Sequence, residues 1–204
     1  MSNFVTNQIV LIGNEAIKNL AIEINRRFSI DWAKTGIDKT AVGRILYGLK
    51  GNSSLLRSSI SATSVFCEAP LGPLDSLRLI SERYPIREVQ DHILRHASKL
   101  DPKLIVYMEY REEYPRFVGA RYALIKDGEI KAYEENIDTY GYTVVTEEEV
   151  DDIRNEFKAD GDDPSTVITW EDISAILWNA REKEFANMCR ENKGINESAL
   201  KFYF

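Results

Sequence analysis

His92 and His96 are the only two histidines in this chain of 204 residues. They stand four positions apart within Ile86 to Leu100, where apolar residues recur at helical spacing. Both imidazoles are therefore expected on one helix face, within reach of a single metal ion. A zinc-protease helix needs Glu directly after its first histidine, and that position is Ile93. The pair is more typical of a helix that borders a core, so we expect no metal and no cofactor.

Two loops contain residues that other proteins use for ions or phosphates. Asp160, Asp162 and Asp163 resemble part of a calcium loop, but the Glu that completes an EF-hand loop is missing. The segment 48–54 has two glycines, Lys50 and two serines, without the Gly-Lys-Ser/Thr register of a phosphate-binding loop. The favoured interpretation of both is a solvated surface loop.

No set of residues has the pattern of a catalytic site. Cys67 and Cys189 are far apart in sequence and are expected to be small core residues, which fits a reducing compartment. Glu109, Glu112 and Glu113 are clustered in sequence, but their spacing does not show that they converge. We predict no catalytic residue, and a protein that is not an enzyme is favoured.

An aromatic and basic stretch between residues 107 and 122 permits a second interpretation, as a site for single-stranded nucleic acid. Sheets that bind RNA stack bases on exposed aromatic rings, and cations hold the phosphates. The short run from Arg116 to Tyr122 only faintly resembles the motif of RNA-recognition modules. The residues assigned to this alternative are Lys50, Tyr110, Arg111, Arg116 and Tyr122.

Charge is distributed unevenly along the chain. Residues 1–126 hold 18 basic and 13 acidic side chains, whereas residues 127–163 hold 14 acidic and 3 basic ones. Such an acidic segment is typical of a solvated surface, and it also suits a basic protein partner, because its field steers association. The residues assigned to partner binding are Glu134, Glu135, Asp138, Glu147, Glu148, Asp151 and Asp152.

Composition favours a soluble, cytoplasmic protein. Charged residues make up 29% and hydrophobic residues 44%, as in a globular domain. No apolar run approaches the roughly 20 residues that span a bilayer, and the first residues lack the pattern of a signal peptide. No membrane contact is expected.

Periodicity and turn residues predict the elements in order. We expect strands over residues 3–12, 60–67, 104–110, 117–125, 129–133 and 200–204. Helices are expected over residues 14–28 and 40–49, from Asp75 or Ser76, after Pro85, from Thr146, and after Thr169. Asp127-Gly128 predicts a tight hairpin. The last two helices are expected to bury Val150, Ile153 and Phe157, and Trp170, Ile173, Ile176, Leu177 and Ala180, respectively.

The spacing of Asn3, Asn7, Ile9, Leu11 and Gly13, directly before a helix, resembles the start of the YubB-type ferredoxin-like proteins of phages and plasmids. Tyr107 to Glu109 and Phe117 to Gly119 resemble that family's later strands. The resemblance covers roughly two-thirds of the chain in element order. It implies an α+β fold with a split βαβ antiparallel sheet, helices on one face and a C-terminal helical extension.

The expected organisation is a core over residues 1–140, with a Gly-rich basic insertion near 30–59. An acidic helical extension over residues 141–204, ending in a strand, is expected to pack on that core as one unit. Together with the resemblance, the acidic segment predicts a non-catalytic accessory protein of a phage or mobile element. It would bind and modulate a host defence or nucleic-acid-handling protein through a basic surface on that protein.

Overall fold

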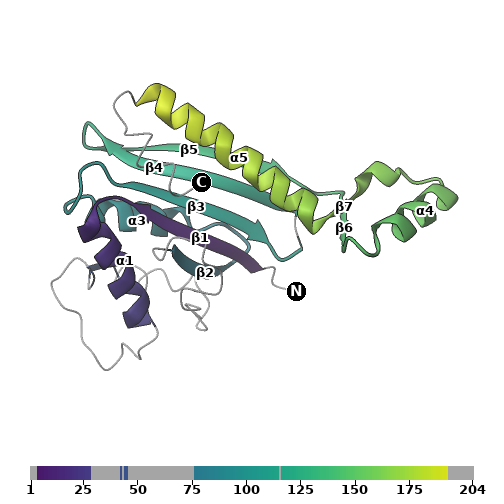
Figure 1. Ribbon diagram of the computed structural model, residues 1–204, viewed down its shortest axis with the longest axis horizontal. Coiled ribbons are helices and arrows are strands. Elements are labelled where there is room, and N and C mark those ends of the chain that lie inside the picture. Colours follow the sequence, from purple (N-terminus) through teal and green to yellow (C-terminus); the bar gives the residue numbers. More distant parts are fainter. Residues whose placement is uncertain (1–3, 29–41, 43, 46–75, 115, 193–204) are drawn as a thin grey trace.

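The computed structural model describes residues 4–28, 42, 44–45, 76–114 and 116–192. Its body is a sheet of five strands in the order β2-β1-β3-β4-β5, in which every neighbouring pair is antiparallel (Figure 1). The strands are β1 (Phe4–Ile12), β2 (Ser76–Glu82), β3 (Ile105–Glu112), β4 (Phe117–Lys126) and β5 (Glu129–Asp138). The mixed α and β content and the antiparallel sheet confirm the coarse fold prediction.

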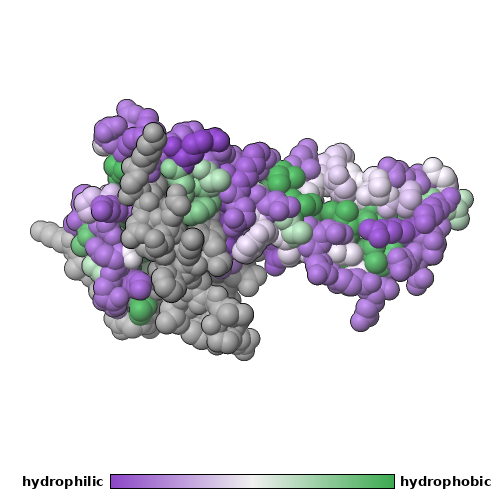
Figure 2. All heavy atoms as spheres, turned by 45° about the horizontal axis from the view of Figure 1, so that its top comes forward, coloured by the Kyte–Doolittle hydropathy of each residue, from purple (hydrophilic) through white to green (hydrophobic). Residues whose placement is uncertain are grey.

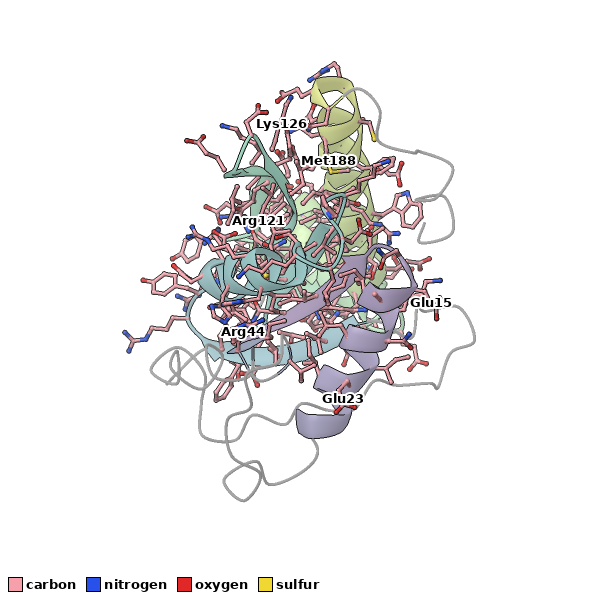
Figure 3. All side chains as sticks on the ribbon, turned by 90° about the vertical axis from the view of Figure 1, so that its left-hand side faces the viewer. Glu15, Glu23, Arg44, Arg121, Lys126 and Met188 are labelled. Atoms are coloured by element: carbon pink, nitrogen blue, oxygen red, sulfur yellow. The ribbon has the colours of Figure 1, made fainter. Side chains whose placement is uncertain are left out.

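Helices cover both faces of the sheet. Helices α1 (Glu15–Phe28) and α3 (Arg87–Ala97) pack on one face, and α5 (Trp170–Glu191) crosses the other above β4 and β5 (Figure 1). Alternation along β1 supplies both layers, since Ile9 and Leu11 join the α1 and α3 core while Val10 and Ile12 join the α5 core. Met188, labelled in Figure 3, is a buried residue of α5 in the second of these cores. The sheet is therefore a central layer with two cores.

Strands β2 and β3 form a split βαβ unit with helix α3. Both strands pair antiparallel with β1, so they run parallel to each other with β1 between them, and α3 connects them in sequence. Helices α1 and α3 do share one face, as expected. The C-terminal helix covers the opposite face, so the prediction of helices on one face holds only for the core helices.

The prediction of a helix from Asp75 or Ser76 is wrong, because Ser76–Glu82 forms strand β2. Leu77 and Leu79 are buried and alternate with the other positions, and the strand pairs along most of β1. That period of two suits a sheet, where residues two apart share a face. Strand β5 is also longer than predicted, since it continues to Asp138.

Several predicted elements lie wholly or partly outside the described residues. The strands over 60–67 and 200–204 and most of the basic insertion belong to this group. Of the helix expected over 40–49, the three described residues are helical, and two of them, Val42 and Ile45, are buried in the α1 and α3 core.

Two residues of the N-terminal motif have structural roles. The buried Asn7 amide donates to the Val5 carbonyl and to the Ser81 hydroxyl, both at 3.0 Å, and its oxygen accepts from the Ile86 backbone. A Cβ at Gly13 would lie 2.8 Å from Ile17, so glycine lets α1 start directly after β1. The motif therefore fixes how β1, β2 and α3 meet.

The hairpin prediction at Asp127-Gly128 is confirmed. Both residues have positive φ, 54° and 81°, as a two-residue turn of the type that matches the twist of a β-ribbon requires. The turn joins β4 to β5, whose pairing runs from Lys126 with Glu129 to Phe117 with Asp138.

A small lobe projects beyond one end of the sheet, between β5 and α5 (Figure 1). It contains β6 (Thr143–Val145), α4 (Val150–Asp160), a 3-10 turn (Pro164–Thr166) and β7 (Val167–Thr169). Strands β6 and β7 pair in parallel, and the Arg154 guanidinium donates to the Val167 carbonyl at 3.0 and 3.2 Å. We call residues 143–169 the acidic lobe.

The burial predicted for α4 is wrong. No residue of α4 is buried, and Val150, Ile153 and Phe157 are only half-covered. The lobe holds too few residues around α4 to enclose its apolar side. Part of that side therefore stays in contact with solvent.

The burial predicted for α5 is partly wrong. Ile173, Leu177 and Ala180 are buried as expected, but Trp170 is 38% exposed and Ile176 is half-buried. The helix begins as predicted after Thr169, whose hydroxyl accepts from the Asp172 backbone in a capping box. Within the described residues, no helix is long and apolar enough to cross a bilayer.

Candidate functional site

The two glutamates of β5 that were assigned to partner binding are held by the chain's own cations. Arg87 of α3 contacts Glu134 with its Nε at 2.8 and 2.9 Å and with a terminal nitrogen at 2.6 Å. Glu135 points to the other face, where Lys183 of α5 lies 2.6 Å away. These carboxylates join the helices to the sheet, and a partner would have to displace a cation to reach them.

Glu134 is the centre of a polar cluster beneath α3. The Tyr110 hydroxyl donates to it at 2.6 Å, and the buried Arg121 lies 3.7 Å from its second oxygen. Arg121 also pairs with Asp91 at 2.8 Å, and it donates to Gln90 (Arg121 is labelled in Figure 3). Burial alone raises the pKa of the Glu134 carboxyl, but hydrogen bonds from Arg87 and Tyr110 outweigh it and hold that pKa below its ordinary value.

Gly119 makes room for this cluster. A Cβ at this position would overlap the Tyr110 phenol and would lie 2.6 Å from the Glu135 carbonyl. The glycine of the Phe-x-Gly strand therefore lets the Tyr110 ring cross β4 to reach Glu134.

We expect Gly119→Ala to destabilise the fold by about 2 kcal/mol, because the added methyl overpacks a site closed by backbone. Thermal unfolding of the purified variant checks this. Gly128→Ala is a useful comparison, since a Cβ there meets nothing within 4 Å and only the positive φ of 81° opposes it. A Gly119→Ala variant as stable as the wild type would show that Tyr110 does not need this space.

The acidic lobe carries a charge balance equal to that of the whole protein. It holds nine acidic and two basic side chains, and the net charge of the chain is −7. The charges of all residues outside the lobe sum to zero. The acidic character of the protein is therefore concentrated in the element that projects from the body.

Some carboxylates of this region have local structural roles. Glu147 accepts from the Glu171 backbone at 3.1 Å, and Asp138 accepts from the Tyr140 backbone at 2.8 Å. Hydrogen bonds from Thr146 lower the pKa of Glu149, and those from Ser165 lower the pKa of Asp163. These contacts shape the loops and the start of α5.

Three of the residues assigned to partner binding remain available. Glu148, Asp151 and Asp152 are exposed, and no ion pair holds them within the part of the chain that the structure describes. They lie before and within the first turn of α4. Of the seven residues predicted to bind a partner, these three lobe carboxylates are the ones that we retain as candidates.

The lobe surface also has apolar parts. In Figure 2, hydrophobic residues form a band across the projecting lobe and its junction with the body, framed by hydrophilic ones. The half-covered apolar residues of the lobe are Val144, Val145, Val150, Ile153 and Phe157. An apolar centre with a polar rim is the usual arrangement of a protein interface.

The nucleic-acid alternative loses its aromatic platform. Tyr110 is 1% exposed beneath α3 and Tyr122 is 0% exposed beneath α5, so the alternating face that each occupies is covered by a helix. Arg111 and Arg116 are exposed, and Lys50 lies outside the described residues. The structure does not bring the proposed stacking residues to one open surface.

The two histidines lie side by side on α3, as their spacing predicts. Their ring centroids are 4.5 Å apart, and His92 Nε2 lies 3.0 Å from the Arg44 carbonyl oxygen. Burial, followed by His92, Lys99 and Arg44, lowers the pKa of His96. Among the described residues, no three His, Cys, Asp or Glu side chains converge on a position for a metal.

Sequence reasoning missed two exposed tryptophans on α5. Trp170 and Trp178 are 38% and 49% exposed and border the half of the sheet that α5 leaves open. Helical periodicity assigned Trp170 to the core and did not single out Trp178. The signal that was available is their separation of eight residues, which places both near one side of a helix.

No protein-family model, no curated protein and no solved structure matches this chain.

Proposed function

We propose that this protein is a non-catalytic binding protein whose acidic lobe engages a basic surface on a protein partner. The observation that carries the proposal is the separation of charge: the lobe holds the whole net charge of −7, while Glu134 and Glu135 are neutralised within the body. A charged lobe that projects from a neutral body gives a directed field, which accelerates encounter with a basic partner.

The resemblance to YubB-type proteins supports an origin in a phage or mobile element. On that basis, the proposed partner is a host protein in the host cytoplasm, either a defence factor or a protein that handles nucleic acid. Such host proteins carry basic surfaces for phosphates. An acidic lobe that occupies such a surface would compete with nucleic acid and so modulate the host protein.

Capture from host-cell lysate tests this function. The immobilised wild-type protein is expected to retain a basic protein at about 50 mM salt and to release most of it at about 300 mM, because salt screens exposed charges. Nuclease treatment of the lysate should leave the capture unchanged. Capture that requires nucleic acid, or that is indifferent to salt, would contradict the proposal.

A further inference from the structure

Among the described residues, α5 covers only part of its face of the sheet. It packs on β4 and β5, whereas side chains of β1 and β3 on that face line a hollow of about 250 Å³. Its polar side chains are Thr6 and Gln8 from β1 and Glu109 and Arg111 from β3. Gln8 and Arg111 are exposed, so this floor is accessible to a ligand.

Aromatic rings border this floor along α5. The Arg111 guanidinium lies 5.7 Å from the centre of the Trp170 ring. Farther along the helix, Arg181 lies 5.0 Å from the Trp178 ring and 5.5 Å from the Tyr107 ring of β3. These rings can accept a guanidinium, and part of each is occupied by an arginine of the protein itself. Trp170 and Trp178 nevertheless keep 38% and 49% of their surface exposed.

Glu109 lies on β3 between these two aromatic contacts, two residues from Tyr107 and two from Arg111. One of its oxygens accepts from the Tyr107 hydroxyl at 2.8 Å, which fixes the carboxylate at the floor. We call the set Thr6, Gln8, Glu109, Arg111, Trp170 and Trp178 the tryptophan groove. It offers a positioned carboxylate beside exposed rings.

The groove is continuous with the acidic lobe. Trp170 is the first residue of α5 and directly follows β7, and Glu147 of the lobe accepts from the backbone of the next residue, Glu171. An extended partner segment that runs from the lobe onto the body would therefore contact Trp170 first and the groove floor next. The nearby lobe charge disfavours a polyanion here and favours a cationic segment.

We propose that the tryptophan groove binds an arginine-bearing extended segment of the basic partner. The proposal rests on the proposed function and adds the chemical class that the surface recognises. A guanidinium is planar, so it stacks on an indole and pairs with a carboxylate at the same time, whereas an ammonium acts as a point charge. The lobe attracts the partner, and the groove selects arginine over lysine.

Two fluorescent peptides of identical length and charge test the groove, one carrying only arginine as its basic residue and the other only lysine. Anisotropy titrations with the full chain are expected to show tighter binding of the arginine peptide, by about fivefold. The double variant Trp170→Ala/Trp178→Ala should abolish that preference. Tyr84→Ala is the matched control, since Tyr84 is 66% exposed on the loop before α3 and should leave both affinities unchanged.

The lobe variant Glu148→Gln/Asp151→Asn/Asp152→Asn separates the two proposals. This variant should lower the affinity for both peptides by the same factor and should keep the preference for the arginine peptide. Equal affinities for the two peptides, or a preference that survives loss of both tryptophans, would overturn the groove and leave the lobe intact. Failure of both peptides to bind at low salt would overturn both proposals. A single-stranded DNA probe that binds through Trp170 and Trp178 more tightly than the arginine peptide would also overturn the arginine assignment.

Discussion

Replacing Glu134 by glutamine is expected to lower the free energy of unfolding at pH 7 by about 2–3 kcal/mol. The substitution keeps the shape of the side chain but leaves the buried Arg121, whose side chain is 7% exposed, with only Asp91 as a counter-ion. Removing one partner of a buried ion pair costs about 3–5 kcal/mol when the other charge stays buried. The expected cost is smaller here because Arg87 is 37% exposed and can turn to water.

Thermal unfolding measures this effect, and Glu135→Gln provides a matched control. A loss of about 2–3 kcal/mol corresponds to a fall in Tm of roughly 4–12 °C in a protein of this size. The adjacent Glu135 faces the other side of the sheet and pairs with Lys183, which is 57% exposed, so its substitution should cost under about 1 kcal/mol. Equal losses in the two variants would contradict a special role for the cluster beneath α3.

The same variant has a defined pH dependence. The folded protein holds the pKa of Glu134 below the ordinary carboxyl value of about 4.3, so this group stabilises the fold fully above that value. The stabilisation is lost as the pH falls through the lowered pKa of the folded state. The stability difference between wild type and Glu134→Gln should therefore be constant near pH 7 and should close below about pH 4. A difference that is unchanged down to pH 3 would exclude the carboxylate charge as its cause.

Neutralising the three available lobe carboxylates is expected to lower the affinity for the captured partner by about tenfold at low salt. The variant Glu148→Gln/Asp151→Asn/Asp152→Asn changes the net charge from −7 to −4 and breaks no ion pair among the described residues. Because these residues precede or open α4, circular dichroism should first show that the helix content is unchanged. Equilibrium titration against the purified partner then gives the affinity.

The control for this experiment neutralises three carboxylates outside the lobe, so that the net charge changes by the same amount. Glu15, Asp127 and Glu129 are exposed and lie at the end of the sheet opposite the lobe, where β1 and β4 end and β5 begins. The variant Glu15→Gln/Asp127→Asn/Glu129→Gln should weaken partner binding by less than about threefold, because the length of β5, about 30 Å, separates these positions from the lobe and exceeds the screening length. Equal weakening in both variants would mean that only the net charge matters and that the lobe is not the contact surface.

Local chemistry allowed much of the fold to be predicted. Asp127-Gly128 specifies a tight turn by itself, and Thr169 with Asp172 specifies the start of α5, because both signals act within four residues. Strand β2 has only the short alternation of Leu77 and Leu79 as a strand signal, and Asp75 or Ser76 before it also suits a helix start. The antiparallel pairing of β1 with β2 depends on contacts more than 60 residues apart, which periodicity does not encode.

The candidate site was less predictable for two physical reasons. Tyr110 is buried on the α3 side of the sheet and Tyr122 on the α5 side, so alternation alone could not show that both rings are covered. The acidic count could not separate Glu134 from Glu148, because the cation that neutralises Glu134 is 47 residues earlier in the chain. The structure separates the carboxylates that pair with cations of the body from those that are exposed on the lobe.

The most direct measurement of the central claim is the association rate constant of the captured partner as a function of ionic strength. We expect the wild-type rate to fall at least about tenfold between about 25 and 300 mM salt. The lobe variant should associate more slowly at low salt and show a shallower salt dependence, while the Glu15, Asp127 and Glu129 variant should follow the wild type. Identical salt dependence in the wild type and the lobe variant would contradict the account.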